Sequence, residues 1–178
     1  MSDLKDRFVA RAGLGDQPSL WEMVEAIREM PYGRPSERTA AGTVQEWRGT
    51  CSTKHALLAE LLDERPEFEL QLVHRVYRVD PAIALERFGP DAAEAVPSDG
   101  LVDVHTYAIV NITGEPVKID VTFPGHLWDG RSDMQLACGP GDDYPVPEGE
   151  DPSALKEHLV REHCDPAVRE PFIASLSA

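Results

Sequence analysis

The chain has 178 residues, 42% of them hydrophobic and 28% charged, which suits a single globular domain with a sizeable core. Its 17 Lys and Arg residues and 32 Asp and Glu residues give a net charge of −15 at pH 7. This charge repels phosphate backbones and anionic lipid surfaces, so we expect no nucleic acid and no membrane among its partners.

The negative charge is concentrated in the second part of the chain. Residues 1–79 carry 11 basic and 13 acidic side chains, a net of −2, whereas residues 80–178 carry 6 and 19, a net of −13. We interpret this excess as a solubilising surface. The same repulsion argues against an acidic carrier protein as an acyl donor.

Targeting signals and cysteine usage indicate where the protein works. Residues 1–10 are charged and contain no apolar stretch typical of a signal peptide, and no apolar run approaches the roughly 20 residues needed to cross a bilayer. The three cysteines lack C-x-x-C spacing and fit free thiols in a reducing compartment. We therefore expect a cytoplasmic protein with free Cys51, Cys138 and Cys164.

Two helices are predicted in the first third of the chain. Ser19-Leu20-Trp21-Glu22 has the form of a capping box and opens an amphipathic helix that Pro31-Tyr32-Gly33 ends. Residues 34–50 contain Pro and Gly and are predicted as a connection. A second helix is predicted from Cys51 to about Glu64, with leucines at helical spacing facing a core.

Strands dominate the middle of the chain. Residues 69–79, 102–112 and 117–123 have the alternation or the β-branched content of strands. A short helix is predicted around residues 82–88. Thr113-Gly114-Glu115-Pro116 is typical of a hairpin turn, which makes the last two strands antiparallel neighbours.

Beyond Pro124 the chain is predicted to be rich in loops up to Glu150, followed by an amphipathic helix over residues 152–162. Helices followed by antiparallel strands indicate the α+β class. We predict one domain over residues 1–178, with an unassigned extension over 125–178. The apolar residues expected to cover the sheet or a cleft in that extension are Leu155, Leu159, Val160, Phe172 and Ile173.

Cys51 is the first candidate for chemistry. At the start of a helix it receives the field of the unpaired N–H groups, which favours thiolate over thiol, and those N–H groups can bind an oxyanion. Gly49 is expected to keep the approach narrow and to adopt unusual dihedral angles. The alternative is that Cys51 is simply a small buried residue.

A thiol nucleophile needs a base, and the base needs an orienting group. If Thr113-Gly114 form a two-residue turn, paired positions of the two strands sum to 227, and a four-residue turn gives 229. Both registers place His105 and Asp120 on one face of the sheet as diagonal neighbours, roughly 7–8 Å apart. A loop of odd length would separate them. His105 alone could be an ordinary strand histidine, but Asp120 is costly to bury without a partner.

Three segments resemble the transglutaminase-like superfamily, which shares the papain-like fold. They are G-T-C-S-T-K-H-A-L-L-A-E-L-L, D-V-H-T-Y-A-I-V and V-K-I-D-V-T-F, and together they lie within residues 45–124. The resemblance implies a catalytic triad of Cys51, His105 and Asp120 that needs no cofactor. It also implies an oxyanion donor before the cysteine, for which Gln45 is preferred and Trp47 is the second candidate.

Other side chains are candidates for the surroundings of the site. His55 lies four residues after Cys51 on one helix face and is either a wall of the site or a core histidine. Lys54 could add positive potential near the thiol, but we expect a solvated lysine. Trp128 and Tyr144 are candidates for a substrate wall.

Metal and phosphate sites are not expected. Neither His158, His163 and Cys164 nor Cys51 and His55 have the spacing of a zinc site. The acidic loop residues lack EF-hand spacing, and the glycine-rich segment 138–141 is not followed by the Lys-Ser/Thr of a phosphate loop. The acidic residues in question are Asp129, Asp133, Asp142 and Asp143.

The sequence thus predicts a cysteine enzyme that cleaves or exchanges an amide or ester bond of a small-molecule or peptide substrate through an acyl-thioester. Two alternatives remain open at this stage, a non-catalytic module that binds a peptide or partner and a redox-sensing thiol protein. The sequence does not indicate the substrate, the acyl acceptor or the oligomeric state.

Overall fold

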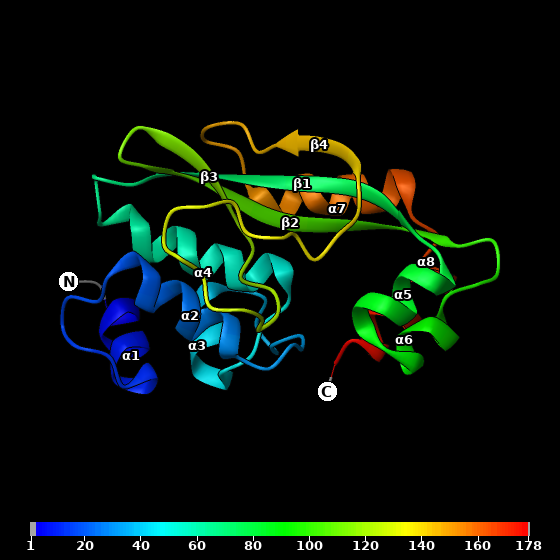
Figure 1. Ribbon diagram of the computed structural model, residues 1–178, viewed down its shortest axis with the longest axis horizontal. Coiled ribbons are helices and arrows are strands. Elements are labelled where there is room, and N and C mark those ends of the chain that lie inside the picture. Colours follow the sequence, from blue (N-terminus) through cyan, green and yellow to red (C-terminus); the bar gives the residue numbers. More distant parts are fainter. Residues whose placement is uncertain (1–2, 178) are drawn as a thin grey trace. The chain divides into compact units, whose positions relative to one another are not determined.

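The computed structural model describes residues 3–177, which form eight helices and four strands, as the α+β prediction requires (Figure 1). In chain order the elements are α1 (Asp3–Ala12), α2 (Leu20–Glu29), α3 (Ala40–Glu46), α4 (Cys51–Asp63), β1 (Glu69–Val79), α5 (Pro81–Phe88), α6 (Pro90–Ala95), β2 (Leu101–Ile112), β3 (Glu115–Ile119), β4 (Gly141–Pro145), α7 (Pro152–His163) and α8 (Pro166–Ser175).

The four strands form an antiparallel sheet in the order β3-β2-β1-β4. The chain divides into two compact units, the first made of Met1–Leu72 and Tyr107–Leu136 and the second of Val73–Thr106 and Ala137–Ala178. The boundaries between the units cut through β1 and β2, so each unit contains a part of these two strands.

In the first unit, α1 contacts α3, and α4 contacts both α2 and α3. The capping box is confirmed, because the side chain of Ser19 accepts from the backbone of Glu22 and the Glu22 carboxylate accepts from Ser19. Helix α4 begins at Cys51 as predicted. The buried apolar side chains of α2 and α4 form the core of this unit, namely Leu20, Met23, Val24, Ile27, Leu57, Leu58, Leu61 and Leu62.

The prediction that residues 34–50 form a connection is wrong, because this segment contains α3. Thr39 caps that helix by accepting from the backbone of Gly42. A Cβ atom added at Gly42 would lie 2.1 Å from the carbonyl oxygen of Glu37, so only glycine fits there. Helix α1 was also not predicted, although its Phe8 is fully buried.

The hairpin between β2 and β3 has the predicted two-residue turn. The observed pairs Ala108↔Ile119 and Ile112↔Glu115 both sum to 227. However, β3 ends at Ile119 and does not continue to Phe123. The reason is local: the carboxylate of Asp120 accepts from the backbone N–H of Thr122, which bends the chain away from the sheet.

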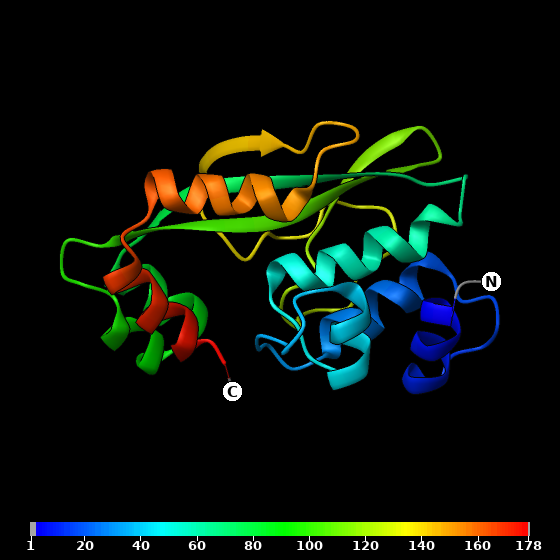
Figure 2. The same cartoon turned by 180° about the vertical axis from the view of Figure 1, so that it is seen from behind.

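In the second unit, β4 pairs with β1, and α6 contacts both α5 and α8. The predicted helices 82–88 and 152–162 correspond to α5 and α7. The segment up to Glu150, predicted to be rich in loops, contains one short strand that was not predicted, β4. In both ribbon views α7 lies along the part of β1 and β2 that belongs to this unit (Figures 1 and 2). Three of the expected covering residues are buried, namely Leu159, Phe172 and Ile173.

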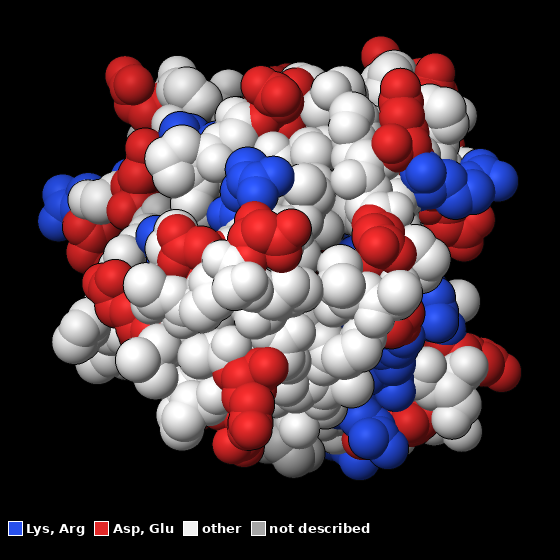
Figure 3. Space-filling view, turned by 90° about the vertical axis from the view of Figure 1, so that its right-hand side faces the viewer, with Lys and Arg blue, Asp and Glu red and all other residues white. Residues whose placement is uncertain are grey.

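No helix within residues 3–177 is long and apolar enough to cross a bilayer. On the face drawn in Figure 3, acidic and basic side chains are interspersed and separated by broad uncharged areas. The acidic excess is therefore not gathered into one patch on this face.

Candidate active site

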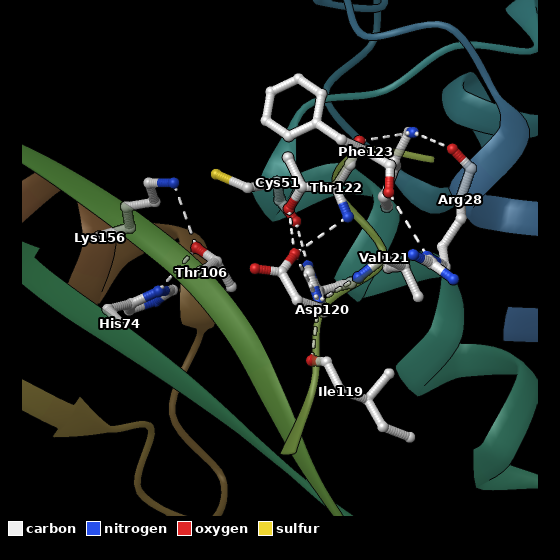
Figure 4. A network of polar contacts seen from close by, with 12 residues as sticks. Arg28, Cys51, His74, Thr106, Ile119, Asp120, Val121, Thr122, Phe123 and Lys156 are labelled. Atoms are coloured by element: carbon white, nitrogen blue, oxygen red, sulfur yellow. Dashed lines mark hydrogen bonds and ion pairs between the residues drawn. The ribbon is translucent and has the colours of Figure 1, made fainter. Parts of the chain in front are cut away.

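Cys51 is the first residue of α4 and is 8% exposed. Thr50 precedes it in an extended conformation, and the backbone N–H of Thr50 donates to the hydroxyl of Thr53 at 3.0 Å. The helix therefore starts sharply at the cysteine, with the N-terminal end of its dipole at the thiol. Figure 4 shows the sulfur pointing to the left of the view.

Gly49 has a different role from the one predicted. Its φ is not in the left-handed range, so unusual dihedral angles are not the reason for glycine at this position. A Cβ atom would instead lie 2.8 Å from Cγ of Lys54 and 2.8 Å from Oγ1 of Thr53. The backbone of Gly49 also bonds to Pro31 and Gly33, which ties the start of α4 to the end of α2.

Gly49→Ala is expected to lower the free energy of unfolding by about 1–3 kcal/mol, because the added methyl group must displace the Lys54 and Thr53 side chains. Urea denaturation followed by circular dichroism measures this change. Gly15→Ala is the matched control: nothing lies within 4 Å of its Cβ, and we expect a change within about 0.5 kcal/mol. Equal effects of the two substitutions would contradict the crowding at Gly49.

Asp120 immediately follows β3 and is 4% exposed. Its Oδ1 atom accepts from the backbone N–H of Thr122 at 3.0 Å and from the Thr122 hydroxyl at 2.5 Å. In Figure 4 its other carboxylate oxygen points away from Thr122, toward the same side of the view as the Cys51 sulfur. One carboxylate oxygen of Asp120 is thus held by Thr122, and the other points to the same side as the Cys51 sulfur.

His55 is fully buried, which favours the core histidine over the substrate wall. Its Nδ1 lies 2.6 Å from the carbonyl oxygen of Cys51, and its Nε2 accepts from the backbone N–H of Val121 at 3.1 Å. These two contacts fit a neutral ring that is protonated on Nδ1. In that tautomer the 3.9 Å approach of Nε2 to Asp120 is not an ion pair.

The prediction of a solvated Lys54 is wrong, because this side chain is fully buried. Its Nζ donates to three carbonyl oxygens, of Met30 at 2.6 Å, of Thr122 at 2.8 Å and of Arg28 at 3.2 Å. Burial lowers the pKa of Lys54 to about 8, while the charge of Asp120 acts in the opposite direction. The three donors of the ammonium group match the three acceptors, which is what a buried ammonium requires.

Arg28 holds the segment that follows Asp120. It is 6% exposed, and its guanidinium donates to the carbonyl oxygens of Phe123 at 3.4 Å and of His126 at 3.0 Å. A Cβ atom at Gly125 would lie 2.6 Å from this guanidinium. Phe123 stacks on Tyr32 with ring centroids 5.1 Å apart. Helix α2 thus fixes the loop that begins at Asp120.

His105 lies in the second unit, on β2, and is 5% exposed. The rings of His105 and Tyr77 meet edge to face, with their centroids 6.4 Å apart. The Tyr77 hydroxyl donates to Asp103 at 3.3 Å, and Arg169 donates to the same carboxylate at 2.7 Å. These buried polar neighbours fix the strand that carries His105.

The next residue of β2, Thr106, belongs to another buried polar chain. Lys156 donates to the Thr106 hydroxyl at 3.1 Å, and this hydroxyl lies 3.0 Å from Nδ1 of His74. Nε2 of His74 lies 2.8 Å from the carbonyl oxygen of Pro152. This series of polar contacts attaches α7 to β1 and β2 within the second unit.

The two oxyanion candidates lie near the end of α3. Gln45 is exposed. Trp47 is the C-cap residue with a positive φ of 57°, and its ring stacks on Phe8 and lies under Arg11. Arg11 also donates to the Val44 and Gln45 carbonyl oxygens. These contacts of Trp47 are thus packing contacts at the end of α3.

Trp128 and Tyr144 have structural partners. Trp128 is 7% exposed, its Nε1 donates to the Ser132 carbonyl oxygen at 2.7 Å, and its own carbonyl oxygen accepts from Trp21. Tyr144 is half-buried on β4, paired with His74 of β1. The burial of Trp128 is that of a packed core residue and leaves little of its ring for a substrate.

The remaining two cysteines are free thiols. Cys138 is buried, and burial raises the pKa of Cys164 to about 11, with a contribution from Asp103. Within the described part of the chain, no three His, Cys, Asp or Glu residues gather in a way that could hold a metal ion. Asp129 has hydrogen bonds from Ser132 and Arg131, which lower its pKa to about 2.

Lys54 and Arg28 were missed as residues that build the site. The signal for Lys54 was present, because it lies three and seven residues before Leu57 and Leu61 and therefore on their apolar stripe. Neither a model of a protein family, nor a curated protein, nor a solved structure matches the chain.

Proposed function

We propose that the chain is a thiol-dependent acyl-transfer enzyme of the transglutaminase-like kind. Cys51 is the nucleophile, His105 the general base and Asp120 the group that orients the imidazole. The observation that carries this proposal is the arrangement of Cys51 and Asp120 within the first unit. A thiol at the first position of α4 and a buried carboxylate anchored beside that helix direct their reactive atoms to one side (Figure 4).

The hairpin register supports the choice of His105 as the base. The pairs of β2 with β3 sum to 227 as far as Ile119, and a continuation of this register by one residue would put Asp120 on the face of β2 that carries His105. A loop with an odd number of residues would have put His105 and Asp120 on opposite faces and removed this support.

The reaction follows from these roles. The imidazole accepts the proton of Cys51, and the sulfur attacks the carbonyl carbon of an amide or ester to form a tetrahedral oxyanion. Collapse of this intermediate forms a thioester, and the departing amine or alcohol receives the proton from the imidazolium. Water or a second amine then attacks the thioester, its proton passes through the imidazole, and the thiol is restored. The substrate is a small or peptidic amide or ester.

The experiment is alkylation of Cys51 by iodoacetamide as a function of pH, measured by mass spectrometry in a Cys138→Ser/Cys164→Ser background. We expect rapid alkylation at neutral pH, because a thiolate and not a thiol reacts. His105→Ala and Asp120→Asn are each expected to slow it by about tenfold or more at neutral pH and to move the midpoint of the rate to higher pH.

Circular dichroism controls for folding of each variant. A wild-type rate profile in a folded His105→Ala variant would contradict the proposal. If Cys51 is unreactive at neutral pH in both the wild type and His105→Ala, the non-catalytic binding module becomes the better interpretation. If Cys51 is reactive in both proteins, a redox-sensing thiol becomes the better interpretation.

A further inference from the structure

Two adjacent residues of α4, Lys54 and His55, connect the nucleophile helix to the segment that carries Asp120. Both are fully buried, and they lie three and four residues after Cys51, one helical turn along. Both also contact backbone atoms of residues 119–122. An ammonium group and an imidazole are expensive to bury side by side, so their presence in the core calls for an explanation beyond packing.

His55 connects the two segments through opposite sides of its ring. Nδ1 donates to the carbonyl oxygen of Cys51, and Nε2 accepts the N–H of Val121, the residue after Asp120. With its lone pair directed at the N–H of Val121, Nε2 lies 3.9 Å from Oδ1 of Asp120 and does not act as a donor to it. Thr122 donates to Oδ1 of that carboxylate through both its N–H and its hydroxyl.

Lys54 acts on the residue that holds the carboxylate. Its ammonium group donates to the carbonyl oxygen of Thr122 at 2.8 Å, while Thr122 donates twice to Asp120 (Figure 4). The other two donors of Lys54 go to the end of α2, at Met30 and Arg28. The order of contacts is thus Lys54 to Thr122 to Asp120, with the whole series out of water.

We propose that Lys54 and His55 are positioning residues that fix the direction of the Asp120 carboxylate relative to Cys51, an inference that rests on the proposed function. Neither touches a reacting atom. His55 sets the distance between the start of α4 and Val121, and Lys54 sets the orientation of Thr122. Together they leave the second oxygen of Asp120 directed to the side of the Cys51 sulfur (Figure 4).

The experiment uses substitutions that separate the contacts of each residue. His55→Gln places an amide oxygen near the position of Nε2 and keeps an acceptor for Val121, whereas His55→Asn places an amide nitrogen near Nδ1 and loses that acceptor. Lys54→Met keeps the length of the side chain without its donors. Leu58→Ala, at a fully buried apolar position of the same helix, is the control for destabilisation alone.

Two readouts are measured in the Cys138→Ser/Cys164→Ser background. The first is amide hydrogen exchange at Val121 and Thr122, and the second is the pH profile of Cys51 alkylation. We expect Lys54→Met and His55→Asn to accelerate exchange at these amides more than Leu58→Ala does. We expect both to slow alkylation at neutral pH by between about tenfold and a hundredfold. His55→Gln should keep the wild-type exchange at Val121 and an alkylation profile near that of the wild type.

The outcomes separate the positioning role from the enzyme itself. Exchange at Val121 and Thr122 that changes no more than in Leu58→Ala overturns the positioning role. So does a wild-type alkylation profile in Lys54→Met and His55→Asn while Asp120→Asn shifts it. A wild-type profile in Asp120→Asn overturns the proposed function instead, and the exchange data then still decide whether the two side chains hold the segment.

Discussion

Lys54→Met is expected to lower the free energy of unfolding by about 2–4 kcal/mol at neutral pH, because three buried carbonyl oxygens lose their donor at once. The methionine side chain fills a similar volume, so the loss measures the hydrogen bonds and not a cavity. Urea denaturation of both proteins gives the difference. Lys118→Met, on a half-buried position of β3, is the control and should change stability within about 0.5 kcal/mol.

The same comparison has a defined pH dependence. The pKa of Lys54 is lowered to about 8 by burial, whereas the unfolded chain keeps the proton up to the ordinary value of 10.5. Between these values the unfolded state binds more protons, so this group makes the free energy of unfolding rise with pH, by at most about 1.36 kcal/mol per pH unit. The stability difference between wild type and Lys54→Met should therefore widen from pH 8 to 10.5 and stay constant below pH 8. A stability difference that narrows between pH 8 and 10.5 would contradict the lowered pKa of Lys54.

Asp103→Ala is expected to lower the free energy of unfolding by about 3–5 kcal/mol, because it removes the buried carboxylate that pairs with the buried guanidinium of Arg169. Asp103 and Arg169 are 5% and 8% exposed, and the Tyr77 hydroxyl depends on the same carboxylate. Thermal and urea denaturation measure the loss. It should appear in the second unit first, where Asp103 joins β2 to α8.

The neighbouring pair of Arg169 with Glu170 provides the control. The Glu170 side chain is 45% exposed, so Glu170→Ala should lower the free energy of unfolding by less than about 1 kcal/mol. Replacing both buried partners, as Asp103→Leu with Arg169→Met, should recover most of the stability lost in Asp103→Ala. A double variant as unstable as the single one would show that shape and not charge governs this position.

Elements with strong local signals could be predicted from the sequence. The capping box at Ser19 and the leucine stripe after Cys51 predicted α2 and α4, and Thr113-Gly114 predicted the hairpin register. Each of these depends on residues close in sequence. The signals were sufficient because neighbouring side chains and backbone decide the structure there.

The missed elements depend on distant contacts. Helix α3 has seven residues and a glycine in its first turn, so its propensity and its apolar stripe are both weak. Strand β4 is polar and mostly exposed, and it exists because it pairs with β1, some 70 residues earlier. Such a strand has no alternation of apolar residues from which it could be predicted.

The candidate site was predictable in its residue types but not in its supports. Cys51 and Asp120 could be selected because a thiol at a helix start and a carboxylate in an apolar strand are each unusual. The place of Lys54 on the apolar stripe of α4 could be read from the sequence, but its acceptors could not, since they come from residues 28, 30 and 122. Only the tertiary structure brings these three carbonyl oxygens to one point.

The composition of the two outer strands has a consequence for self-association. Strand β3 begins with Glu115 and Pro116, and β4 carries Asp142 and Asp143 and ends at Pro145. Short length, carboxylates and proline all oppose docking of a foreign strand onto an open border. The composition of both border strands therefore disfavours growth of the sheet by backbone pairing with another copy of the chain.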